Sequence, residues 1–193
     1  MSDKVIEKDY LITWILLALA DSALKDFLAF KGGTALKKIY FPDYRYSEDL
    51  DFNLKKDIVN DELILKLNEA LDRLAKEQGL QFAVPPEKIE KRAGSLTAYI
   101  NFVGPLQARM DSRSIKVDFT LSEKLIFPVE PKEIHSPYSD AVSRIFPTYS
   151  LEEILVEKLC AIIGRTVPRD IYDVNDLFGT SGIEFHKIPD AIR

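Results

Sequence analysis

Apolar and polar residues alternate from residue 49 to residue 54, as in a β-strand with one buried face. Leu50, Phe52 and Leu54 fall on one face, and Asp49 and Asp51 fall on the other. Side chains two positions apart in a strand point the same way, so the two carboxylates share one surface. The segment therefore predicts a strand with an apolar face toward the core and an acidic face away from it.

Similar patterns predict the strands and helices of the chain up to residue 121. Short apolar runs bounded by glycine or proline predict further strands at residues 27–30, 80–84, 96–103 and 114–121. Apolar residues at helical spacing predict helices at residues 8–25, 34–39 and 60–78. Gly79 stands where the last of these helices needs a C-terminal cap.

The C-terminal third is predicted to be mostly helical. Residues 123–149 contain four prolines, which is typical of irregular or edge structure. Ser150 and Glu153 form a capping-box pattern that predicts a helix to about residue 163. Pro168 fits the first turn of a final helix through residue 178. Together these elements predict an α+β (mixed α/β) fold, in which a mixed sheet is flanked by helices and followed by a C-terminal helical region.

Composition narrows the class of protein. The chain has 193 residues, of which 46% are hydrophobic and 30% charged, as in an ordinary soluble domain with a sizeable core. Its net charge of -5 excludes a general nucleic-acid coat, although a local basic patch can still bind RNA. The single cysteine, Cys160, excludes an internal disulfide and is expected to be buried. No membrane span or signal peptide is recognisable, so we expect a cytoplasmic protein.

A glycine pair precedes the acidic strand and has a use of its own. Gly32 and Gly33 stand before a predicted helix, where backbone N–H groups can approach phosphate oxygens closely. Two carboxylates side by side, Asp49 and Asp51, suit a Mg²⁺ ion that carries a triphosphate. An acidic face that merely meets water is the alternative interpretation of the pair.

Two further positions belong to this hypothesis. Asp118 is the single acid in a strand-forming run, on the face opposite Val117 and Phe119. A third carboxylate can complete a metal site and accept a proton, but a solvent-facing acid is equally compatible with the pattern. Ser47 is either a turn residue or a hydroxyl that contacts a phosphate or orients Asp49.

Lys158 interrupts the apolar stripe of the predicted helix at residues 150–163. A lysine in such a stripe extends to solvent or binds an anion. The anion is either a phosphate or a carboxylate, and Asp170 and Asp173 share one face of the next helix. Basic residues also gather at three places, where they contact a triphosphate or RNA or are simply solvated: Lys31, Lys37, Lys38 and Arg45; Arg109, Arg113 and Lys116; Lys158, Arg165 and Arg169.

These motifs resemble a known family. The glycine block, the Asp-Leu-Asp step and Val-Asp-Phe at residues 117–119 are similar to the nucleotidyltransferase fold of the DNA polymerase beta superfamily. Lys-Gly-Gly-Thr-Ala-Leu at 31–36 and Arg-Tyr-Ser-Glu-Asp-Leu-Asp-Phe at 45–52 more closely resemble the AbiEii/AbiGii toxin nucleotidyltransferases. Glu-Lys-Leu-Cys-Ala at 157–161 and Arg-Asp-Ile-Tyr-Asp at 169–173 support that resemblance.

The resemblance implies a function, a cofactor and partners. It implies a toxin of a toxin–antitoxin or phage-defence system that transfers a nucleoside monophosphate from an NTP, with Mg²⁺ or Mn²⁺, to an RNA such as the tRNA 3′ end. It also implies a cognate antitoxin as partner. Residues 1–125 would form the nucleotidyltransferase core, and residues 126–193 a helical region that completes the active-site cleft, or both would form one continuous domain.

The resemblance also assigns roles to residues by position. The catalytic set is Ser47, Asp49, Asp51, Asp118, Lys158 and Asp170. The metal ligands are Asp49, Asp51 and Asp118, and the NTP-binding residues are Lys31, Gly32, Gly33, Thr34, Ser47 and Lys158. Gly33-Thr34 departs from the Gly-Ser of many superfamily members but keeps a hydroxyl. Relatives often continue with further helices, which would contribute to binding of the acceptor.

Two other functions fit the same sequence. A catalytically silent nucleotidyltransferase-fold module would bind a nucleotide or an antitoxin without transfer, although it would have no need of three acids and Lys158. A small-molecule nucleotidyltransferase of the antibiotic-modifying kind would use the same core with a different acceptor.

Overall fold

The computed structural model describes residues 2–164 and 167–188. Its chain forms two compact units, each described here by itself. The first comprises Met1–Glu123 and Pro131–Pro147, and the second comprises Lys124–Glu130 and Thr148–Arg193. Arg165, one of the basic residues considered above, lies outside the described residues.

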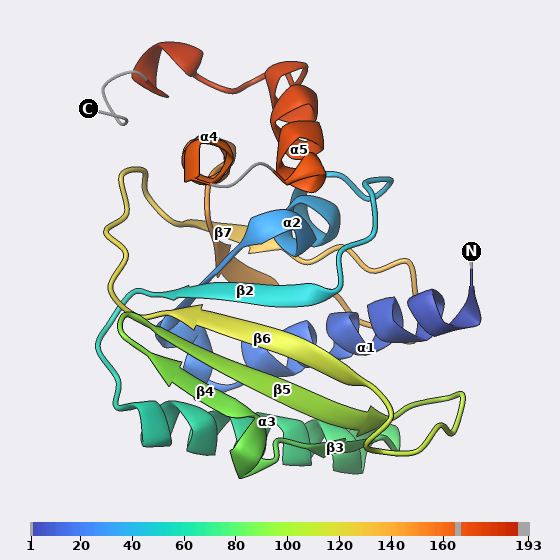
Figure 1. The fold of residues 1–193 in the computed structure, drawn as a ribbon. Helices are drawn as coiled ribbons and strands as arrows, with labels where there is room; N and C mark the ends of the chain where they lie inside the picture. The colour runs from blue at the N-terminus through green and yellow to red at the C-terminus, as the bar shows by residue number, and fades with distance from the viewer. Residues whose placement is uncertain (1, 165–166, 189–193) are drawn as a thin grey trace. The chain divides into compact units, whose positions relative to one another are not determined.

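The described residues build a mixed sheet in the order β3-β5-β6-β2-β1-β8-β7, with β4 added on β5 (Figure 1). The strands are β1 (Leu28–Lys31), β2 (Asp49–Leu54), β3 (Gln81–Ala83), β4 (Ile89–Arg92), β5 (Ser95–Val103), β6 (Ser114–Thr120), β7 (Glu130–Glu133) and β8 (Ile145–Thr148). β2 and β6 run parallel, whereas β1 pairs with β2 and β5 with β6 in antiparallel fashion. The predicted mixed α+β architecture is confirmed.

The apolar faces of the central strands form an aromatic core. Phe52 of β2 stacks on Phe119 of β6 with ring centroids 5.8 Å apart. Phe30 of β1 lies 5.4 Å from Phe52, and Phe146 of β8 lies 5.9 Å from it. These rings fill one side of the sheet, so the alternating polar residues of β2 and β6 face the other side.

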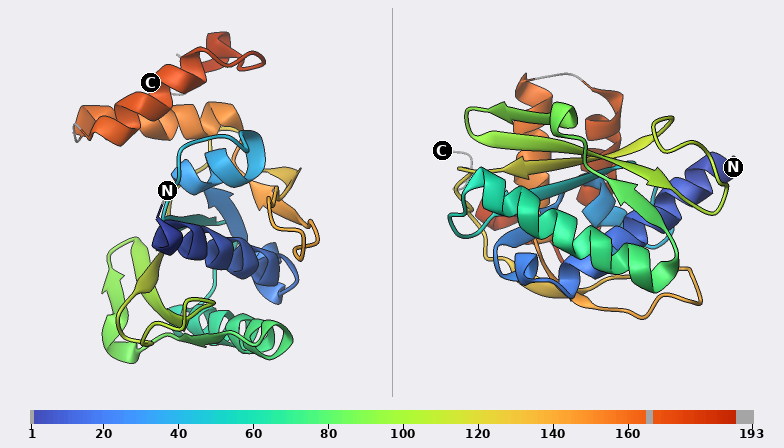
Figure 2. Two further views of the ribbon diagram at one scale, coloured as in Figure 1. Left: turned by 90° about the vertical axis from the view of Figure 1, so that its right-hand side faces the viewer. Right: turned by 90° about the horizontal axis from the view of Figure 1, so that it is seen from below.

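Helices α1 (Asp3–Ala20) and α3 (Asn60–Gln78) lie side by side (Figure 2). α3 has the predicted bounds, and Gly79 caps it with a φ of +65°. α1 begins before the predicted residue 8 and ends before residue 25. Its first turns are held by tertiary contacts that local periodicity does not reveal, since buried Glu7 pairs with Arg113 at 2.5 Å and accepts from the Leu106 N–H.

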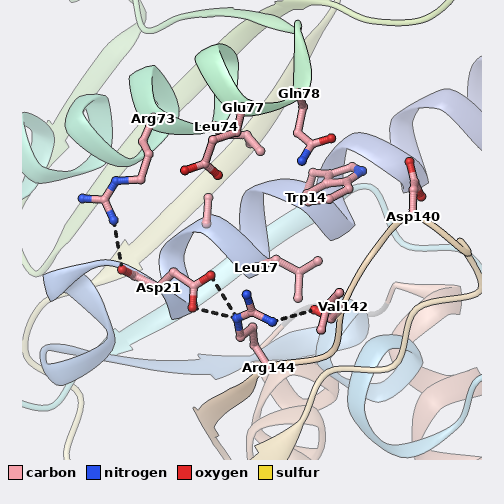
Figure 3. Close-up of a pocket in the computed structure, with 11 residues that line it drawn as sticks. Trp14, Leu17, Asp21, Arg73, Leu74, Glu77, Gln78, Asp140, Val142 and Arg144 are labelled. Atoms are coloured by element: carbon pink, nitrogen blue, oxygen red, sulfur yellow. Dashed lines mark hydrogen bonds and ion pairs between the residues drawn. The ribbon is translucent and has the colours of Figure 1, made fainter.

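A cavity of about 360 Å³ lies between α1, α3 and residues 140–144 (Figure 3). Leu17 and Leu74 contribute apolar surface, and Arg144 Nε donates to both carboxylate oxygens of Asp21 at its edge. Arg73 donates to the backbone oxygen of Asp21. Because these polar groups already bind one another, we interpret the cavity as a gap in the packing between the two helices.

α2 (Gly32–Ala35) continues without a break into a π-helical turn, Leu36–Tyr40. The Phe41 N–H donates to the Leu36 oxygen at 2.8 Å, which is the i to i+5 bond of a π-turn. The predicted helix at residues 34–39 is thus present but begins at the glycine pair. α2 is a direct continuation of β1, which brings its first turn beside β2.

The second unit contains α4 (Leu151–Gly164) and α5 (Pro168–Phe178), close to the predicted bounds. The capping box is only half formed. Ser150 Oγ accepts from the Glu153 N–H at 3.3 Å, but the Glu153 carboxylate accepts from the N–H groups of Ile126 and Phe127. The prediction of a buried Cys160 is wrong, since its side chain is exposed on α4. It lies beside the inward stripe of that helix and not within it.

Among residues 2–164 and 167–188, no helix combines the length and the apolar character that crossing a lipid bilayer requires.

Candidate active site

Three carboxylates project from the polar face of two neighbouring strands. β2 and β6 pair in parallel with Asp51 opposite Asp118 and Asp49 opposite Lys116. Because side chains at paired positions point to the same face, the register places all three acids together. The sequence predicted the acids, and the structure supplies the register that brings them to one place.

Asp118 is held by two neighbours, of which the sequence analysis considered Lys116 and missed Thr97. Its Oδ1 accepts from the Thr97 hydroxyl of β5 at 2.5 Å, and its Oδ2 pairs with Lys116 two residues earlier. Asp118 also raises the pKa of Lys116 by its charge and hydrogen bond, against the opposing effect of burial. The i, i+2 spacing of Lys116 and Asp118 on one strand face was the available signal for that pair, whereas Thr97 required the β5–β6 register.

Asp51 is the acid of this cluster whose charged form is clearly destabilised by its surroundings. Burial and the charges of Asp118 and Asp49 raise the pKa of Asp51 to about 6, while Lys31 and Lys116 act in the opposite sense. A carboxyl group with this pKa is destabilised in its charged form. A cation at this place would relieve the repulsion among the three acids.

The glycine pair lies directly against this acidic cluster. Gly32 has a φ of +78°, and a Cβ atom built there would collide with the Asp51 carboxylate, 3.1 Å from its Cγ. A Cβ at Gly33 would lie 3.0 Å from Arg45 Nη2 and 3.3 Å from Ser47 Oγ. The first turn of α2 is therefore enclosed by Asp51 on one side and by Arg45 and Ser47 on the other.

Lys31 and Thr34 bracket the pair and are both buried. Lys31 lies opposite Asp51 in the β1–β2 register, and its Nζ is 2.5 Å from Glu123 Oε2. The Thr34 hydroxyl donates to the backbone oxygen of Asp49 at 2.5 Å. Thr34 thus joins the first turn of α2 to the start of the acidic strand.

The second unit contains its own charged cluster. Lys158 Nζ of α4 lies 2.8 Å from Asp170 Oδ1 and 2.8 Å from Asp173 Oδ2, both on α5. Of the interpretations that the sequence left open for this lysine, a carboxylate partner is the one observed. The pairing links α4 to α5 within this unit.

Several basic residues near the motifs have structural partners. Lys38 pairs with Asp9 in the core, and Lys37 Nζ donates to the backbone oxygens of Pro42 and Tyr44. Arg113 pairs with Glu7. Arg45 lies next to Gly33, since a Cβ atom built on Gly33 would be 3.0 Å from Arg45 Nη2.

The acidic cluster has the ligand types of a divalent-cation site, but its side chains do not form a complete coordination sphere. Among the residues that the structure describes, no three His, Cys, Asp or Glu side chains are arranged to hold a metal ion by themselves. The donor set still fits such an ion, because carboxylate oxygens are the ligands of Mg²⁺, and burial together with the charges of Asp118 and Asp49 raises the pKa of Asp51. Substrate phosphates and water commonly supply the remaining Mg²⁺ ligands.

A comparison with protein families decides the classification. The model of the family described as nucleotidyl transferase AbiEii toxin, type IV toxin–antitoxin system, matches residues 14–193. The chain belongs to this family. The expectation from the motifs is confirmed, and nucleotidyl transfer in general, with an NTP as substrate and an antitoxin as partner, is what AbiEii membership implies.

Solved structures show the same fold for this AbiEii-family protein. JHP933 from Helicobacter pylori is 21% identical with a TM-score of 0.64, over 100% of this chain and 78% of that one. An H. pylori protein described as a candidate nucleotidyltransferase is 20% identical with a TM-score of 0.62, over 94% and 71%. The antibiotic-resistance factor ANT(2'')-Ia is 12% identical with a TM-score of 0.50, over 95% and 88%. No curated protein matches in sequence.

Proposed function

We propose that this AbiEii-family protein is a Mg²⁺-dependent toxin that transfers a nucleoside monophosphate from an NTP to an RNA, with the 3′ end of tRNA as acceptor. The observation that carries the proposal is the position of Gly32 against Asp51, beside Asp49 and Asp118 on paired strands. A close backbone approach next to clustered carboxylates suits a triphosphate and its cation. Because NTPs and tRNA are its substrates, the protein acts in the cytoplasm.

Each residue of the site has a part in this reaction. Asp49, Asp51 and Asp118 would hold the Mg²⁺ ion, or Mn²⁺ in its place, and the ion when bound supplies positive charge to the triphosphate. The backbone of Gly32, Gly33 and Thr34 binds the β- and γ-phosphates. The Thr34 hydroxyl is already bonded to Asp49, so Thr34 contributes its N–H and positions the acidic strand.

The remaining groups orient the phosphates and complete the transfer. Ser47 and Arg45 flank Gly33, and Lys31 lies beside Asp51. The acceptor oxygen attacks the α-phosphorus, the bond to the bridging oxygen breaks, and pyrophosphate leaves. The proton of the acceptor hydroxyl passes to Asp118. Positioning and charge neutralisation supply most of the rate in such a step.

Lys158 and Asp170 complete the proposed catalytic set. We assign Lys158 the neutralisation of charge on the triphosphate and on the departing pyrophosphate. Asp170, which binds Lys158 at 2.8 Å, holds that side chain in place. The motif resemblance supports these two roles, and both residues lie within the range that the AbiEii family model matches.

The test is transfer from each labelled NTP to bulk tRNA by the parent, by Asp49→Ala and by Asp57→Ala. Asp57 is an exposed acid beyond the end of β2 and serves as the matched control. Asp49→Ala should lose on the order of a hundredfold or more of the activity, as expected for a main electrostatic group. Asp57→Ala should keep it. Equal labelling by Asp49→Ala and the parent would refute the assignment.

A small-molecule acceptor is a second candidate, favoured by the fold likeness to the antibiotic-resistance factor ANT(2'')-Ia. Transfer to a small-molecule antibiotic and not to RNA would support it. A silent binding module would instead bind an NTP with Mg²⁺ in calorimetry and transfer nothing to any acceptor.

A further inference from the structure

A lysine and an aspartate form an ion pair in the interior of the first unit, away from the acidic strands. Lys38 Nζ lies 2.7 Å from Asp9 Oδ2, and the two side chains are only 2% and 3% exposed. The Tyr138 hydroxyl donates to the same Asp9 oxygen at 2.8 Å. Three segments far apart in sequence therefore meet at one carboxylate: α1, the π-turn after α2, and residues 134–138.

This pair is poorly suited to stabilising the fold. Among the described residues, Asp9 Oδ1 accepts no hydrogen bond. Burial lowers the pKa of Lys38, and the neighbouring Asp9 charge acts in the opposite sense. Buried ion pairs can often be replaced by apolar side chains of similar size without loss of stability. We therefore expect the ion pair to matter for the position of the segments that it connects.

The arrangement concerns the helix that begins at the glycine pair. Gly32–Ala35 and Leu36–Tyr40 form one continuous helical stretch. Thr34 ties its first turn to β2 through the Asp49 oxygen. Lys38 ties its last turn to α1 through Asp9, and the Lys38 oxygen accepts from the His135 N–H at 2.6 Å. The stretch is thereby fixed at both ends.

The second end of the stretch combines buried apolar residues, Leu36 and Ile39, with polar contacts beside a cavity. A cavity of about 240 Å³ adjoins this turn, lined by Lys37, Lys38, Pro42, His135, Ser136 and Pro137. The wider π-turn allows two consecutive lysines to reach different partners, Lys37 the backbone of Pro42 and Tyr44, and Lys38 the carboxylate of Asp9. Such turns often accompany functional sites.

We propose that Lys38 is a positioning residue, which, through Asp9 and Tyr138, sets the direction in which the N–H groups of Gly33 and Thr34 point toward the triphosphate. The proposal rests on the proposed function, because it assigns those N–H groups to the NTP. Without the pair, the last turn shifts toward the neighbouring cavity and the first turn rotates about its bond to β2.

The experiment separates positioning from stability with a double variant. Lys38→Met alone leaves a buried carboxylate without its counter-ion, so its melting temperature falls sharply. Asp9→Leu combined with Lys38→Met removes both charges, and its melting temperature should return to within about 5 °C of the parent. Lys91→Met, which breaks an exposed ion pair with Asp61 at 2.8 Å, is the control for loss of a lysine charge.

The readouts are NTP binding, steady-state kinetics and backbone amide exchange. In the double variant we expect the KM for the NTP to rise about tenfold, with kcat changed less than about threefold, and the Gly33 and Thr34 amides to exchange faster. Lys91→Met should match the parent. Recovery of KM and amide exchange together with the melting temperature would show a purely structural pair and overturn the proposal.

Failure of the proposed function has a different signature. If the parent neither binds nor turns over any NTP with Mg²⁺, the nucleotidyltransferase assignment falls. Amide exchange at Gly33 and Thr34 still reports then whether Lys38 fixes the helix, because that measurement needs no substrate.

Discussion

Gly32 lies so close to Asp51 that any side chain at position 32 would collide with the Asp51 carboxylate. The contact joins the start of α2 to the acidic face of β2. The glycine pair and the Asp-Leu-Asp step, which lie sixteen residues or more apart in the sequence, are therefore in direct contact in the fold. Gly32 also has a positive φ of +78°, a backbone conformation that glycine adopts without strain and other residues do not.

Replacing Gly32 with alanine tests this contact. Gly32→Ala should reduce nucleotidyl transfer by about a hundredfold or more, because the new methyl group displaces either the helix start or Asp51. Gly79→Ala is the matched control, since Gly79 has a φ of +65° and open space around it. Both variants bear a left-handed strain of about 1–2 kcal/mol, visible in urea unfolding. Equal activity in the two alanine variants would contradict the proposed contact.

The raised pKa of Asp51 predicts how stability depends on pH in the absence of metal. Its folded pKa of about 6 exceeds its unfolded value of about 3.9, so the native state binds more protons between these values. The free energy of unfolding therefore falls as pH rises through this window, by about 3 kcal/mol for this group. Asp51→Asn removes that loss.

Urea unfolding with a chelator at pH 8 and at pH 4 measures the effect. Asp51→Asn should be more stable than the parent at pH 8 and nearly equal to it at pH 4, while it loses transfer activity. Asp57→Asn, at an exposed position, should show no such difference. A less stable Asp51→Asn protein at pH 8 would contradict the raised pKa of Asp51.

Divalent-cation binding should follow the same protonation. With NTP present, Mg²⁺ should raise the melting temperature at pH 8, because it neutralises the carboxylates of Asp49, Asp51 and Asp118. The increase should shrink as pH falls through about 6, where Asp51 takes up a proton. A melting series from pH 5 to pH 8 measures it, and an increase that is independent of pH would exclude Asp51 as a ligand.

Lys158 should matter for stability as well as for transfer. Lys158→Met leaves Asp170 and Asp173 without the ammonium that binds both, so we expect a loss of about 3 kcal/mol in the free energy of unfolding. The control is Lys187→Met, which breaks an exposed pair with Glu184 and should leave the free energy of unfolding unchanged. Urea unfolding of both variants gives the comparison, and similar small losses would argue against a shared lysine.

Glu153 should contribute more to the second unit than a capping residue does. Its carboxylate accepts from the N–H groups of Ile126 and Phe127, so Glu153→Ala leaves two backbone donors without that acceptor and costs about 2–3 kcal/mol. Ser150→Ala removes only the cap at 3.3 Å and should cost about 1 kcal/mol. Thermal unfolding ranks the two variants, and faster amide exchange at residues 126 and 127 in Glu153→Ala identifies the cause.

Most elements followed from local patterns because their signals are local. The apolar spacing of residues 60–78 and the glycine after them gave α3 and its cap, and the alternation around Asp51 gave β2. β4 was missed because Ile89–Arg92 is short and largely polar, and it is a strand through its pairing with β5. Glu153 satisfied the capping-box pattern, yet its carboxylate binds backbone that precedes it by more than twenty residues.

The sequence by itself determined the inventory: an acidic strand after a glycine-opened helix, a third acid on a later strand, and a lysine inside an apolar helical stripe. Periodicity and short motifs carry that information, because they depend on neighbours a few residues apart. The tertiary structure alone decided that Asp51 faces Asp118, that Thr97 and Lys116 hold Asp118, and that Lys38 reaches Asp9. Those relations arise from strand register and from packing between distant segments, and the charges that set the pKa of Asp51 act through space, with no counterpart in the order of residues along the chain.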